Sequence, residues 1–206
     1  ALLDENDLLF VDRTFNDLFW QERDPGAQLH LDGDRLEGWL AVQNGEDGAG
    51  EDLALTARAS LRVFGEGEAP RREGAYDPDL GHTLYLGAAW YDDASLPQGR
   101  AVAAEAFYTW EWLSLSGEYV DHGDGILGGH SFWSATGAVA LEPDTWEVAL
   151  RYEDFSSRSD TFVWRLGLNR YLRGPGTKLQ ANLVRFEHDG ADNHQTLVEI
   201  GLVASF

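Results

Sequence analysis

The sequence lacks cysteine and methionine altogether, and it has a single lysine, Lys178. Without cysteine, the chain can form neither disulfide bonds nor thiolate metal sites. Because position 1 is not methionine, we expect a processed or truncated product from which any signal peptide has been removed. No apolar run approaches the roughly 20 residues that a membrane-spanning helix needs. That absence still allows a membrane protein built from strands, because only every second residue of such a strand must be apolar.

Basic residues are also scarce: 15 Lys and Arg stand against 36 Asp and Glu, for a net charge of −21. Nucleic-acid binding needs cations that face phosphates, so this balance argues against a nucleic-acid partner. Many acidic residues lie in loop-like stretches, such as Asp4–Asp7 and Asp92-Asp93. They form either solvated loops or a surface that attracts or is bridged by cations.

The sequence does contain a period-two alternation of apolar and polar residues along most of its length. It is cleanest over 145–154, where Trp146, Val148, Leu150 and Tyr152 alternate with Glu147, Ala149, Arg151 and Glu153. Such alternation predicts a β-strand with one apolar face. Strands of this kind are predicted at 26–32, 35–43, 52–64, 82–91, 101–110, 112–121, 131–141, 145–154, 160–172, 177–188 and 198–206. The chain is therefore predicted to be all-β, with about eleven strands and no convincing helix.

Two features favour a transmembrane β-barrel over a soluble sandwich. The polar face carries charges in mid-strand, at Arg58, Glu105, Glu118, Arg151, Arg165 and Glu199. A packed core would lose several kcal/mol for each unpaired charge, whereas a water-filled interior tolerates them. The apolar face has aromatics near strand ends, as at lipid–water interfaces: Trp90, Tyr108, Trp110, Tyr119, Trp133, Trp146 and Tyr152.

The final strand ends on Phe206, which we interpret as a membrane-assembly signal on the periplasmic side. The short turns near 32–34, 110–112, 142–144 and 173–176 would then also be periplasmic. The stretches near 44–51, 92–100, 121–130, 155–160 and 189–193 would face outside. On this reading 65–80 is an unusually long periplasmic connection.

Several segments, in order along nearly the whole chain, resemble the phosphate-selective porins O and P. They are Asn6–Arg13 (NDLLFVDR), Leu55–Ser60 (LTARAS), Leu84–Trp90 (LYLGAAW), Ser114–Tyr119 (SLSGEY), Trp146–Tyr152 (WEVALRY), Leu166–Leu172 (LGLNRYL) and the terminal Phe206. The resemblance implies a sixteen-stranded porin of the bacterial outer membrane, assembled as a homotrimer. It begins in mid-protein, so about five N-terminal strands would be supplied by a longer chain or by another chain.

The resemblance also implies an anion-selective lumen lined by arginines and lysines, but the family's lysines have no counterpart here. The candidate pore-lining residues are Arg13, Arg58, Arg62, Glu105, Glu118, Glu147, Arg151, Glu153, Arg165 and Glu199, with Glu37 on the same side. Arginine and glutamate on adjacent strands form either cross-strand pairs that stiffen the wall or a transverse field that filters solutes. We expect a general or cation-leaning pore that is not phosphate-specific.

We divide the chain into a loop or constriction segment, 1–25, and the C-terminal strands of one barrel domain, 26–206. Within the first segment, Arg13 and Arg23 either enter the lumen as a constriction or pair with neighbouring acids in a plug. No nucleophile motif is present, so no enzymatic activity and no cofactor are expected. Asp121-His122-Gly123-Asp124-Gly125 with His130 lacks the spacing of a metal site and is expected to be a solvated loop.

The sequence therefore predicts an outer-membrane porin, in contact with outer-membrane lipid, for passive diffusion of small hydrophilic solutes or ions. The alternative is a structural outer-membrane barrel whose missing N-terminal region anchors the cell wall or a surface layer.

Overall fold

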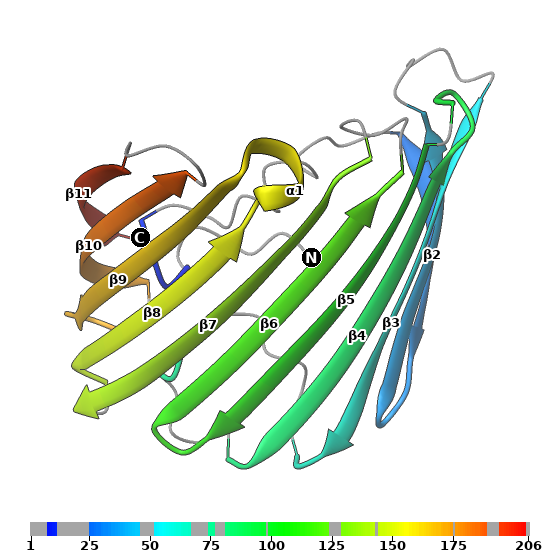
Figure 1. The fold of residues 1–206 in the computed structure, drawn as a ribbon. Coiled ribbons are helices and arrows are strands. Elements are labelled where there is room, and N and C mark those ends of the chain that lie inside the picture. Colours follow the sequence, from blue (N-terminus) through cyan, green and yellow to red (C-terminus); the bar gives the residue numbers. More distant parts are fainter. Residues whose placement is uncertain are drawn as a thin grey trace.

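The computed structural model contains one antiparallel sheet in which eleven strands follow one another in sequence order (Figure 1). It describes residues 8–11, 25–45, 52–66, 74–76, 81–97, 99–123, 129–142, 144–174, 176–188 and 194–204. The strands are β1 (Gly26–Asp32), β2 (Leu36–Asn44), β3 (Leu53–Phe64), β4 (Thr83–Asp93), β5 (Gly99–Trp110), β6 (Leu113–His122), β7 (Ser131–Glu142), β8 (Trp146–Asp154), β9 (Thr161–Tyr171), β10 (Thr177–His188) and β11 (His194–Ala204).

The all-β prediction is thus confirmed, and most strand bounds differ from the predicted ones by two residues or fewer. The predicted apolar faces also agree with the pairing, because apolar residues of adjacent strands lie opposite one another. For example, Leu150 pairs with Leu166 across β8 and β9, and Leu166 pairs with Leu183 of β10. One short helix, α1 (Ser156–Ser159), was not predicted. Among the described residues, no helix is long and apolar enough to cross a membrane.

Tight turns separate the strands at one end of the sheet. Glu111, between β5 and β6, has φ of 48°, and Asp144, between β7 and β8, has φ of 60°. Gly174, between β9 and β10, has φ of 67°, in the left-handed region that glycine adopts without a steric penalty. Since every connection reverses the chain, β11 runs toward this same end.

The sheet curves into a trough, and the described N-terminal residues 8–11 lie on its concave side (Figure 1). The described strands β1 and β11 are its two edges and do not pair with each other. Exposure is highest along the last strand, where Val198, Ile200 and Leu202 are 72%, 79% and 67% exposed. The sheet is therefore open.

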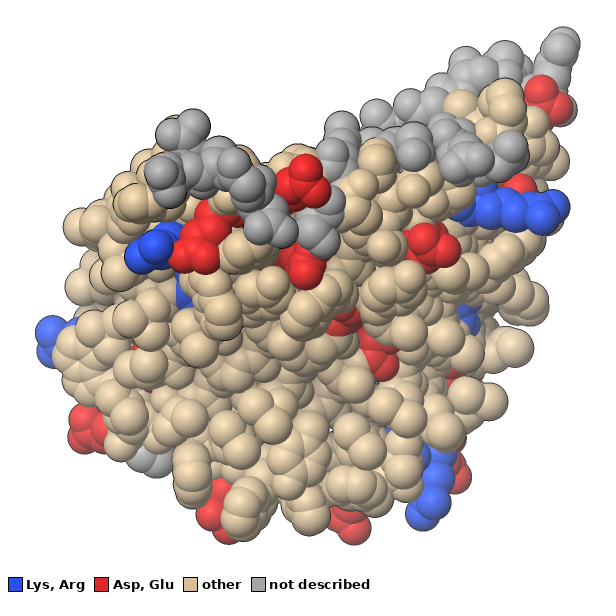
Figure 2. Space-filling view, viewed as in Figure 1, with Lys and Arg blue, Asp and Glu red and all other residues tan. Residues whose placement is uncertain are grey.

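The convex face of the sheet is apolar and exposed. Large hydrophobic side chains from β1 to β11 stand on it, including Leu86, Leu115, Leu150, Leu166 and Leu183. Figure 2 shows this face to be predominantly uncharged, with most charged side chains gathered toward its two ends. Those charges include Asp92 with Arg100 at one end and Arg170 beside Trp146 at the other.

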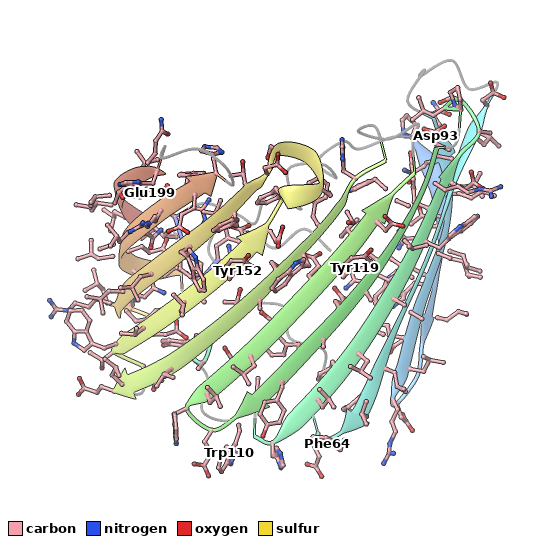
Figure 3. The ribbon with its side chains drawn as sticks, in the orientation of Figure 1. Phe64, Asp93, Trp110, Tyr119, Tyr152 and Glu199 are labelled. Carbon is pink, nitrogen blue, oxygen red and sulfur yellow. The ribbon has the colours of Figure 1, made fainter. Side chains whose placement is uncertain are left out.

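Aromatic side chains occupy the two ends of the convex face. One group contains Trp133, Tyr152 and Trp164, with the Tyr152 ring 4.9 Å from Trp133 and 4.6 Å from Trp164. At the opposite end, Trp110 stacks with Trp112 at 6.4 Å. In Figure 3, Trp110 and Phe64 mark the lower end, while Tyr119 and Tyr152 lie nearer the upper ends of their strands. The predicted aromatic rim is thus present, as two separated rows.

The concave face has the opposite character, because the buried residues of the described chain are more often polar than apolar. Glu147 and Arg151 are 0% exposed, and Arg165 is 2% exposed. The buried apolar cluster is small and consists of Leu9, Phe10, Ala138 and Ala149. In the middle of this sheet, the large apolar side chains point outward and the charged ones point inward.

Candidate functional site

A strap of four residues, Leu8–Val11, lies against the concave face of β8–β11 and is held there by its main chain. The Leu8 carbonyl accepts hydrogen bonds from Lys178 Nζ and from Gln180 Nε2, the latter at 3.3 Å. The Leu9 carbonyl accepts one from Asn169 Nδ2 at 2.8 Å. Leu8, Leu9 and Phe10 are almost completely buried. The strand register brings these three donors to one area, because Lys178 and Gln180 point inward from β10 and Asn169 from β9.

The side chains of the strap fit glycine positions in the sheet. A Cβ atom at Gly167 would lie 2.9 Å from Cε1 of Phe10, and one at Gly201 would lie 3.0 Å from Cγ2 of Val11. On its other side, Phe10 is covered by Arg151, whose Cζ lies 4.5 Å from the ring centroid. A glycine inside a strand commonly marks a close approach by another part of the chain.

A second segment, Gly74–Tyr76, reaches the same wall from the connection between β3 and β4. The Ala75 amide donates to Oε1 of Glu147, and the Tyr76 ring lies 4.3 Å from the Tyr171 ring. Tyr171 in turn donates its hydroxyl to Oε2 of Glu147 at 2.5 Å. The stretch 65–80 was predicted only as a long connection. Its described part in fact folds onto the concave face.

Beside the strap, a buried ion-pair group joins β8, β9 and β11. Arg165 Nε lies 3.0 Å from Oε2 of Glu153, and Arg165 Nη1 lies 3.6 Å from Oε2 of Glu199. Arg151 is the direct cross-strand neighbour of Arg165 and donates to Thr136 Oγ1 at 3.1 Å. Of the two readings of the charged wall, cross-strand pairing is therefore the one that the geometry displays in this part of the sheet.

The opposite side of the trough carries a more accessible charged row across β1–β5. Arg58 pairs with Oε1 of Glu105, although β4 lies between their strands. The residue of β4 beside Glu105 is Gly87, where a Cβ atom would collide with the Glu105 carboxylate. Arg58 also lies 5.5 Å from the Trp39 ring centroid, and His30 stacks on that ring at 5.0 Å. Oε1 of Glu37 accepts a hydrogen bond from Nε2 of His30 at 2.8 Å.

The remaining candidate residues are Glu118 and Arg62, which the structure describes, and Arg13 and Phe206, which it does not. Glu118 faces Glu105 across β5 and β6 and is half-buried. Arg62 donates to the Asp34 carbonyl at the tight-turn end of the sheet. Arg13 and Phe206 lie outside the described residues, as does Arg23. The pore-lining role of the whole set stays a prediction, but all of its described members lie on the concave face.

The loop after β6 is described only in part. His122 is buried against Phe132, with ring centroids 5.6 Å apart, and its amide donates to the His130 carbonyl. Within the described ranges, no group of three or more His, Asp or Glu side chains is placed to hold a metal ion.

Sequence reasoning missed the residues that hold the strap, namely Asn169, Lys178 and Gln180. It also missed Tyr171, which contacts Tyr76. The alternation predicted that these side chains point inward. The partners of Asn169, Lys178 and Gln180, however, are main-chain carbonyls that lie 160 or more positions away in the sequence. Gly167 and Gly201 were the available signal, since glycine is unfavourable inside a strand.

Comparisons of the chain with protein-family models, with curated proteins and with solved structures found no match.

Proposed function

We propose that this chain is part of a bacterial outer-membrane β-barrel through which small hydrophilic solutes or ions diffuse passively. The observation that carries the proposal is the sidedness of the sheet, with an apolar convex face and a charged concave face. An aromatic side chain buries about 150–250 Å² when covered, so one that is 45% exposed leaves on the order of 80 Å² in solvent. Trp110, Trp112, Tyr119 and Trp133 are each 43–47% exposed, and many leucines add to them.

The exposed apolar area of the convex face is larger than soluble proteins usually have. The largest apolar patch on a typical soluble monomer is about 300–600 Å². A lipid bilayer instead favours an apolar band about 25 Å tall with aromatic rows at both interfaces. Five outward positions of one strand, such as those from Phe162 to Arg170, span about 27 Å along the strand at roughly 3.4 Å per residue, which gives about 20 Å of height at a tilt of about 40°. The two aromatic rows and the terminal charges fit such a band.

A barrel needs partners for both edges of this sheet. An unpaired strand edge in lipid costs several kcal/mol for each unsatisfied backbone group. We therefore propose that further strands, from a longer chain or another chain, pair with β1 and β11. The similarity to porins O and P suggests sixteen strands and a homotrimer, and both remain parts of the proposal.

Phosphate specificity is not part of the proposed function. Among the described residues, Lys178 holds the Leu8 carbonyl, Arg165 is paired with Glu153, and Arg58 is paired with Glu105. These cations are engaged by the protein itself, which leaves them less able to bind a permeating anion.

A structural barrel is the second candidate, because the strap and Gly74–Tyr76 cover part of the concave face. A conductance measurement separates the two. Full-length protein is added to a planar lipid bilayer between unequal KCl concentrations. We expect stepwise conductance with a reversal potential near zero or on the cation-selective side. No conductance above that of heat-denatured protein would contradict the pore and favour the structural role. A strongly anion-selective reversal potential would contradict the proposed lack of phosphate specificity.

A further inference from the structure

The strap is bound in a way that depends on main-chain groups and on the shape of the wall. Two carbonyls, those of Leu8 and Leu9, receive three side-chain donors. We call the wall that receives them the seat, which comprises Arg151, Gly167, Asn169, Lys178, Gln180 and Gly201. A hydrogen bond from a charged donor contributes about 1.5–3 kcal/mol, and a neutral one about 0.5–1.5 kcal/mol.

Among the residues of the seat, Lys178 would lose the most stabilisation if the strap were absent. It is 2% exposed, and an ammonium group buried to that extent needs hydrogen-bond acceptors. The Leu8 carbonyl supplies one, and the Tyr171 ring lies 5.8 Å from Nζ. Removing the strap would therefore take a hydrogen-bond acceptor away from a buried ammonium group, which the Glu147 carboxylate also attracts.

The glycines make the seat specific. Side chains at Gly167 and Gly201 would occupy the space of Phe10 and Val11. Neither glycine has a positive φ, so backbone conformation does not require glycine at either position. Close packing of the strap is the remaining physical reason for a side chain to be absent there.

We propose that the strap is permanently docked on its seat as an internal plug, and that Lys178 positions it. The effect of the plug on solute passage rests on the proposed pore function. The charges of β8–β10 hold the plug, and solutes pass along the side formed by β2–β6, where Arg58 and Glu105 are accessible at 25% and 39%. Lys178 is thus a positioning residue and does not bind the permeating solute.

A disulfide trap in the full-length protein tests the docking, and residues 1–206 contribute no cysteine of their own to it. A Cβ atom built at Gly201 lies 3.8 Å from Cβ of Val11, which is the mean separation in disulfides. We expect the double variant Val11→Cys/Gly201→Cys to cross-link in most molecules under mild oxidation in lipid. The matched control is Val11→Cys/Ile200→Cys, because Ile200 points to the opposite face, and it should stay reduced. Free thiols in the first pair, in folded protein that reacts with a water-soluble maleimide, would overturn the proposal.

Single-channel conductance then tests whether the strap stays docked permanently and whether Lys178 positions it. Oxidising the Val11→Cys/Gly201→Cys pair should leave single-channel conductance unchanged, because the strap is already docked. Lys178→Met should raise the conductance by about twofold or more through a wider aperture, and Lys178→Arg should restore it. A rise on reducing the disulfide would identify a moving gate and overturn permanence. Unchanged conductance in Lys178→Met, with heat stability equal to that of the unmodified protein, would overturn the positioning role.

The two proposals can fail separately. If the unmodified protein never conducts, the pore function fails, while the cross-linking result still decides whether the strap is docked.

Discussion

At the scale of single residues, Gly87 shows how one missing side chain permits an interaction between strands that are not neighbours. Arg58 and Glu105 meet over β4 because no Cβ atom stands between them. Both side chains keep some exposure, so they contact water on the concave face. If ions move along this side, as the proposed function requires, the two charges are placed to act on them.

Substitutions of this pair should therefore change ion selectivity in opposite directions. We expect Glu105→Gln to lower the cation-to-anion permeability ratio by about twofold and Arg58→Gln to raise it, because each removes one fixed charge from the wall. Reversal potentials under a KCl gradient measure the ratio. Arg170→Gln, on the convex face beside Trp146, is the control that should leave it unchanged. Equal shifts in the same direction for both variants would contradict the assignment.

The buried ion pair of Arg165 makes a prediction about stability. Arg165→Met takes one pairing cation away from the buried Glu153 and should lower the free energy of unfolding by about 3 kcal/mol. The exposed pair of Arg185 and Glu187 is the comparison, and Arg185→Met should cost less than about 1 kcal/mol. Urea unfolding in lipid vesicles, followed by tryptophan fluorescence, measures both. Similar losses in the two variants would show that burial does not separate the two pairs.

At the scale of elements, the strands were predictable and the strap was not. Alternation depends on residues that are close in sequence, so it located β8 at 145–154 and β10 at 177–188, close to their observed bounds. The strap is a four-residue piece whose partners lie on β8–β11. Its placement depends on tertiary contacts with Asn169 and Lys178, and no local pattern encodes those contacts.

A substitution on one strand can distinguish lipid from water at the convex face. Leu166 is 49% exposed near the middle of β9, and Leu166→Arg should reduce folding stability in bilayers by about 2–4 kcal/mol. Thr177→Arg, at the end of β10, should cost only about 0–1 kcal/mol because the end of a strand lies near the interface. Equilibrium unfolding in lipid vesicles checks both values. If Leu166→Arg is neutral there, the face is not in the membrane.

At the scale of the whole molecule, the open sheet predicts that residues 1–206 are not sufficient for a stable membrane structure. Unpaired backbone groups along β1 and β11 would each cost several kcal/mol in lipid. We expect these residues, produced alone, to give no heat-resistant species in detergent gels, whereas a chain that supplies the closing strands should give one. A heat-resistant monomer of residues 1–206 would contradict the need for further strands.

The sidedness of the sheet is the whole-molecule property on which the account depends. Alternation in the sequence showed that each strand has two different faces, but it could not by itself say which face is inside. The mid-strand charges and the aromatic rim supported an apolar exterior, and the curvature of the sheet gives that arrangement, with Glu147 and Arg151 inside and Leu150 outside.

Spin labels along β6 of the full-length protein test this sidedness most directly, since residues 1–206 contain no cysteine and single cysteines can be added to them one at a time. In lipid vesicles, labels at Leu115, Gly117 and Tyr119 should collide with oxygen dissolved in the bilayer, whereas labels at Ser116 and Glu118 should be shielded from it. Oxygen collision should therefore alternate along β6 with a period of two residues. If a water-soluble nickel reagent reached the labels at Leu115, Gly117 and Tyr119 as readily as those at Ser116 and Glu118, the convex face would lie in water. That result would contradict the membrane barrel.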